Sequence, residues 1–107
     1  MDELAEPALQ KTVDSMVRQA MVDHLRSLLA GQADRVRSDY AEDVRAQAPE
    51  LERLVPVGLK RYEILRDQVE GDTSTMTVHL EGDSERDLVW TWRSVGGRFR
   101  IVDVRPA

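Results

Sequence analysis

The amino-acid sequence predicts an α+β fold in which N-terminal helices pack on a four-stranded antiparallel meander sheet. In the first half of the chain, apolar residues recur with the 3.6-residue period of an α-helix. In the second half, β-branched and aromatic residues gather in short runs, which the hairpin-turn dipeptides Gly71-Asp72, Gly82-Asp83 and Gly96-Gly97 separate. We predict that the 107 residues form one domain.

A long amphipathic helix is predicted over residues 8–30. Pro7 suits its first turn, and Gly31 suits its end, where a left-handed residue without a Cβ is favoured. A second, weaker helical pattern covers residues 33–48, and Pro49 is expected to end it. The apolar stripe of the first helix consists of Leu9, Val13, Met16, Val17, Ala20, Met21, Leu25, Leu28 and Leu29.

Four strands are predicted near residues 59–70, 73–81, 86–95 and 98–104. If each turn holds two or four residues, the alternation of side chains can be followed across the sheet. One face would then carry Leu59, Leu65, Val69, Met76, Val78, Leu80, Val89, Val95, Val102 and Val104. The other would carry Tyr62, Ile64, Thr75, Thr77, His79, Leu88, Trp90, Trp92, Phe99 and Ile101. Because neither face is polar enough to lie open to water, we expect a second subunit, a ligand or the second helix to cover the second face.

The composition narrows the classes of function. A net charge of -5 works against attraction to phosphate backbones, so we expect no nucleic-acid partner. The chain has no cysteine, which excludes disulfides and thiolate chemistry. No apolar run approaches the roughly 18 residues of a membrane span. The start Met1-Asp2-Glu3 lacks the basic and apolar regions of a signal peptide, so the chain as written is expected to be cytoplasmic, or extracytoplasmic if a leader has been removed.

Three segments carry a family resemblance: residues 30–34 after the long helix, residues 39–44, and the last hairpin over residues 97–104. In this order they resemble the nuclear transport factor 2-like superfamily (cystatin-like or ketosteroid isomerase-like fold, with SnoaL-like cyclases), and in particular its small bacterial members of unknown function. The resemblance implies a curved sheet around a conical cavity behind the long helix. It also implies a homodimer formed through a sheet face.

The same resemblance argues against one enzymatic activity. Residues 41–49 align with the stretch that carries the aspartate general base of ketosteroid isomerases, and the position of that base is Ala48. A methyl group cannot abstract a proton. Neither the Asp-Arg-Asp set nor the His-Asp pair of other members can be carried over, so we predict no catalytic residue.

The residues that could contact a ligand are mostly aromatic. Trp90 and Trp92 stand two apart and therefore share a strand face, where they could form core packing, a cavity wall or a dimer interface. The two histidines show no metal-binding spacing, so we predict no metal and no cofactor. For His24 we favour a structural role at the edge of the core, and for His79 a structural or surface role, over a role in chemistry. The ligand candidates are His24, Tyr40, Tyr62, His79, Trp90, Trp92 and Phe99.

The sequence therefore predicts a non-catalytic domain that binds a small apolar ligand or assembles with a protein partner. One alternative is an enzyme that acts on a small hydrophobic substrate, such as an isomerase, cyclase or hydrolase, with His24, Asp39 or Tyr40 as acid or base. Another is the extracytoplasmic domain of an envelope protein or lipoprotein.

Overall fold

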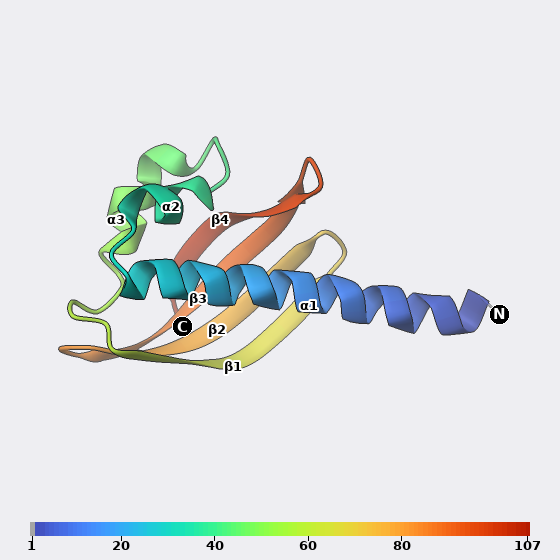
Figure 1. Cartoon of the computed structure of the whole chain (residues 1–107), viewed down its shortest axis with the longest axis horizontal. Helices are drawn as coiled ribbons and strands as arrows, with labels where there is room; N and C mark the ends of the chain where they lie inside the picture. The colour runs from blue at the N-terminus through green and yellow to red at the C-terminus, as the bar shows by residue number, and fades with distance from the viewer. Residues whose placement is uncertain (1) are drawn as a thin grey trace.

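The computed structural model describes residues 2–107, with side chains from Ser15 onward. Its sheet has the strand order β1-β2-β3-β4, and all neighbouring strands are antiparallel. Figure 1 shows α1 crossing one face of this open sheet, with α2 and α3 near the C-terminal end of α1. The α+β fold class is thereby confirmed. The elements are α1 (Asp2–Leu29), α2 (Ala33–Ser38), a 3₁₀ turn (Arg45–Gln47), α3 (Ala48–Glu52), β1 (Arg61–Glu70), β2 (Thr73–Glu81), β3 (Glu85–Val95) and β4 (Arg98–Pro106).

The helical half differs from the prediction in two places. α1 begins at Asp2, so Pro7 lies inside the helix and not in its first turn. Residues 33–48 do not form one helix, because α2 ends at Ser38 and Tyr40 pairs with Ile101 in a parallel bridge. The Ile101 amide donates to the Asp39 carbonyl at 2.7 Å, and the Ala41 amide donates to the Ile101 carbonyl at 2.8 Å. The Asp39 carbonyl and the Ala41 amide are therefore hydrogen-bonded to β4, and they cannot also form the hydrogen bonds of a continuing helix.

The predicted distribution of side chains over the two sheet faces is wrong, because one loop length differs. The turn between β2 and β3 holds three residues, so Glu81 pairs with Glu85. This single extra residue changes the parity of the hairpin, and Met76 comes to lie opposite Trp90 on the same face. Register shifts after Ile64 in β1 and after Ile101 in β4 change once more which residues of those two strands point to the inner face.

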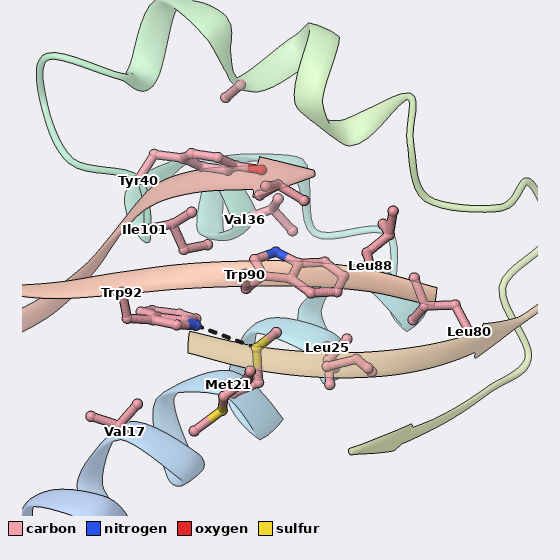
Figure 2. Close-up of a cluster of buried hydrophobic side chains, with 14 residues drawn as sticks. Val17, Met21, Leu25, Val36, Tyr40, Leu80, Leu88, Trp90, Trp92 and Ile101 are labelled. Atoms are coloured by element: carbon pink, nitrogen blue, oxygen red, sulfur yellow. Dashed lines mark hydrogen bonds between the residues drawn. The ribbon is translucent and has the colours of Figure 1, made fainter. Parts of the chain in front are cut away.

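The face that the helices cover, here called the inner face, holds the core. Met21 of α1 and Tyr40 pack against the tryptophans of β3 (Figure 2). The Trp92 Nε1–H group donates to the Met21 Sδ atom at 3.3 Å. Each tryptophan removes roughly 150–250 Å² from water, so this pair contributes much of the stabilising burial. Inner-face residues that are fully buried include Met76, Val78, Leu80, Leu88, Trp90, Trp92, Ile101 and Val104.

The opposite face, here called the outer face, is polar. Threonines and charged side chains occupy most of it, and Val89 and Val95 are its apolar members on β3. The expectation that both faces are apolar is therefore wrong. The sheet has the usual antiparallel arrangement, with one face packed and the other in contact with water. The outer-face residues of β2 are Thr73, Thr75, Thr77, His79 and Glu81.

No helix within residues 2–107 combines the length and the apolar character that a membrane span requires.

Candidate functional site

The predicted ligand residues separate into two groups on opposite sides of the sheet. Four of them meet in the core, where the His24 ring centroid lies 6.0 Å from that of Tyr40, 6.3 Å from that of Trp90 and 5.9 Å from that of Trp92. None of these four residues exposes more than 1% of its surface. Tyr62 and Phe99 are partly buried and pack against the same core. His79 lies on the outer face, away from the aromatic residues with which the sequence grouped it.

His24 is a hydrogen-bonded core residue. Its Nδ1–H group donates to the Asp39 carboxylate at 2.8 Å, which fixes the proton on Nδ1 because a carboxylate only accepts. The ring edges of Tyr40, Trp90 and Trp92 surround it. The pair ties α1 to the segment that bridges to β4, and the structural role that the sequence favoured fits this geometry.

Tyr40 is an acid or base candidate of the enzyme alternative, and Ala48 stands where the resemblance would place a general base; both are buried in the core. Burial raises the pKa of the Tyr40 hydroxyl well above its usual value, and the negative charges of Glu52 and Asp39 raise it further. The phenol therefore stays protonated at neutral pH and cannot act as a base. Ala48 is fully buried and presents only a methyl group.

A second group of ionisable side chains lies on the outer face, beside the turn between β2 and β3. We call Arg61, His79, Glu81, Glu85 and Asp87 the His79 cluster. His79 pairs with Asp87 across the two strands, and Glu81 pairs with Glu85. Because alternate residues of a strand point to the same side, these two rungs project the four β2 and β3 side chains together.

His79 is held from both sides. Its Nδ1–H group donates to Asp87 Oδ1 at 2.6 Å, and its Nε2 atom lies 3.5 Å from Glu81 Oε1 and 3.9 Å from Glu85 Oε1. The hydrogen bond to Asp87 raises the pKa of His79, and the charges of Asp87, Glu85 and Glu81 raise it further, against a smaller effect of desolvation. The imidazolium form of His79 therefore persists to higher pH than that of an ordinary histidine.

Arg61 orients Glu81. Its Nε atom lies 2.8 Å and its Nη2 atom 2.6 Å from Glu81 Oε2. This two-pronged contact lowers the pKa of Glu81, mainly through the hydrogen bond itself. Since Arg61 engages Oε2, the other carboxylate oxygen is left to face His79.

A shallow recess of about 300 Å³ opens beside the cluster, lined by Arg61, Tyr62, Glu63, His79 and Glu81. Its volume lies at the lower end of the range for small-ligand sites, but its lining is charged where such sites are mostly apolar. In the His79 cluster beside it, three carboxylates stand against two basic side chains. The recess therefore suits a small polar or cationic group better than the apolar ligand that the sequence predicted.

Sequence reasoning singled out only His79 from this cluster. A signal was present, because His79-x-Glu81 and Glu85-x-Asp87 stand symmetrically about residues 82–84. The prediction began β3 at residue 86 and assumed an even loop, so Glu85 was left out and the rungs were not aligned. With an odd loop, the same spacing places all four side chains on one face.

No protein-family model matches the chain. A search of the curated proteins gave no significant match either.

Proposed function

We propose that this protein is a non-catalytic binding domain whose working surface is the His79 cluster on the outer face. The observation that carries this proposal is the convergence of four ionisable side chains of β2 and β3 on the solvent-facing side of the sheet, where two of them, His79 and Glu81, line a recess. His79 is hydrogen-bonded to Asp87 and Arg61 is hydrogen-bonded to Glu81, so these side chains are oriented. Oriented polar groups around a recess are the usual means by which a binding site sets its specificity.

The core supports the non-catalytic part of the proposal. An acid or base must come within hydrogen-bond reach of its substrate. His24 and Tyr40 are each 1% exposed, and aromatic rings pack against the imidazole. Chemistry at these residues would require the core to open. The enzyme alternative therefore has less support from the geometry than a binding role has.

The resemblance to the nuclear transport factor 2-like superfamily agrees with a binding role, since that superfamily includes non-enzymatic binding domains. A homodimer through the outer face would rest on polar contacts, because the face carries threonines together with charges of both signs. Charged rims of this kind set specificity and association rate more than they set affinity.

Native mass spectrometry of freshly purified protein tests the proposal. We expect a bound small molecule or a second polypeptide in the wild-type spectrum. The variant His79→Gln/Glu81→Gln should lose it, because both side chains line the recess. Glu70→Gln is the matched control: it removes one acid from an exposed position of β1 at the other end of the sheet.

Two results would count against the proposal. One is a monomer without bound mass. The other is a bound mass that the cluster variant retains and that Phe99→Ala removes, since that ring packs against the core and does not line the recess. The second result would favour the apolar ligand that the sequence predicted.

A further inference from the structure

We propose that His79, Glu81 and Glu85 form a binding site for a divalent transition-metal cation of the Zn²⁺ type. This inference rests on the proposed function and names the class of ligand that the His79 cluster takes. One nitrogen and two carboxylate oxygens, one from each residue, lie within 4.8 Å of one another.

The spacing of the donor atoms is close to that of a metal site. Zn²⁺ binds nitrogen and oxygen ligands at roughly 2.0–2.2 Å, so two ligands of a tetrahedral site lie about 3.4 Å apart. His79 Nε2 lies 3.5 Å from Glu81 Oε1 and 3.9 Å from Glu85 Oε1. Glu85 lies on the outer face with 69% of its side chain exposed, so a change of rotamer can bring its carboxylate closer without disturbing the core.

The two neighbouring residues of the cluster aim the ligands at a common point. Asp87 accepts the proton of His79 Nδ1, so neutral His79 carries its lone pair on Nε2, the atom that faces Glu81 and Glu85. Carboxylate–histidine–metal arrangements of this kind orient the ring and increase its basicity. Arg61 holds Glu81 Oε2 in the same way and leaves Oε1 toward His79.

The electrostatics of the hairpin favour a cation at this point. Glu81 and Glu85 stand directly opposite each other, a like-charge cross-strand pair that destabilises a sheet. Arg61 contacts Glu81 but not Glu85 among the ion pairs of the described side chains. A divalent cation between the two carboxylates would replace this repulsion by attraction. With three protein ligands on an open face, water would complete the coordination.

The imidazole sets the choice of metal. Mg²⁺ and Ca²⁺ prefer six or more oxygen ligands, whereas imidazole nitrogen suits Zn²⁺, Cu²⁺ and Ni²⁺. We therefore expect Zn²⁺ to bind in the presence of excess Mg²⁺. Binding must also release the proton of the imidazolium, because the metal and the proton compete for His79 Nε2.

Isothermal titration of the chelator-treated full chain with ZnCl₂, in a buffer that contains excess Mg²⁺, tests the site. We expect one Zn²⁺ per chain. Asp87→Asn should weaken binding about 10- to 100-fold, as losses of outer partners of metal ligands do. His79→Ala and Glu85→Gln remove ligands themselves and should weaken binding at least as much, whereas Glu70→Gln should leave it unchanged.

A second readout separates this site from adventitious surface binding. Titration at about pH 6, in buffers of different protonation enthalpy, should reveal proton release, because a histidine is mostly protonated below its ordinary pKa, and His79→Ala should abolish that release. The proposal is overturned if Zn²⁺ does not bind, or if it binds equally well to His79→Ala. If Zn²⁺ does not bind while the His79→Gln/Glu81→Gln variant still loses its native ligand or partner, the metal is wrong and the proposed binding function stands.

Discussion

The two tryptophans of β3 have similar burial but different polar surroundings. Trp92 donates its Nε1–H group to Met21 Sδ. Trp90 Nε1 is buried and has no hydrogen-bond partner among the described residues. A buried donor without a partner costs roughly 1–3 kcal/mol of desolvation, whereas a satisfied one contributes roughly 1 kcal/mol net.

Replacing each tryptophan by phenylalanine therefore separates packing from hydrogen bonding. Both variants lose the same volume, but Trp90→Phe also removes the unpaired donor. We expect Trp92→Phe to lower the free energy of unfolding by about 2–4 kcal/mol more than Trp90→Phe does, because the first variant loses a hydrogen bond and the second removes an unpaired donor. Urea denaturation followed by tyrosine fluorescence or circular dichroism measures the difference. Equal losses would show that the sulfur contact contributes nothing and that water reaches Trp90 Nε1.

Among the secondary-structure elements, β1 carries one residue more than its partner requires. Ile64 pairs with Val78 and Arg66 pairs with Thr77, so Leu65 is the inserted residue of a bulge. Leu65 is also half exposed. Beyond the bulge, the pairs again match inner-face with inner-face residues, since Asp67 lies opposite Met76. The bulge thus changes which residues of β1 alternate, but inner-face residues of β1 and β2 remain paired on both sides of it.

Deleting Leu65 should consequently be tolerated. The shortened strand would alternate regularly from Ile64 to Arg66, and the cost should stay within about 1 kcal/mol, as for surface changes. Deleting Thr77 from β2 is the matched control. It would move the buried residues on one side of the deletion to the outer face, and we expect the protein not to fold. Thermal melts followed by circular dichroism distinguish the two, and a severe loss in the Leu65 deletion would show that the bulge is required.

On the scale of the whole molecule, two ionisable residues of the outer face give stability a dependence on pH. The folded-state pKa of His79 is raised above 6.5, so its contribution is present below pH 6.5 and is lost as the pH rises through the folded pKa. The folded-state pKa of Glu81 is lowered below 4.5, so its contribution is present above pH 4.5 and is lost on further acidification. These two residues favour the folded state most between the two values.

The variant Asp87→Asn isolates the contribution of His79. It should bring the pKa of His79 down toward its ordinary value, which an NMR titration of the imidazole measures. The stability difference between wild type and variant should be larger at about pH 6 than at about pH 9, because neutral His79 no longer gains from the carboxylate. A difference that does not change with pH would show that Asp87 acts only through packing.

The sequence could predict the fold class because periodicity is a local property. Helical spacing near Met21 and glycine dipeptides between apolar runs each show themselves within a few residues. The faces of the sheet could not be predicted, because they depend on whether the loop after Glu81 holds two residues or three. If the predicted length of such a loop is wrong by one residue, every side chain beyond the loop is assigned to the wrong face.

The candidate site was missed for the same reason. Trp90 and Trp92 drew attention because aromatic residues are rare in this chain, and they prove to be core. The carboxylates around His79 looked like ordinary surface charges, since in sequence they are separated by a turn. Only the register brings His79 and Asp87 opposite each other.

The bridge between residues 39–41 and β4 has a consequence for aggregation. An open sheet has two edges, and unpaired edge amides invite other chains to add strands and form fibrils. At β4, the hydrogen bonds of Ile101 to Asp39 and Ala41 already occupy part of one edge. At β1, the bulge and the charges from Arg61 to Glu70 disrupt the other. Both edges are thus partly blocked against strand addition, so we expect this sheet to resist the edge-to-edge pairing that starts fibrils.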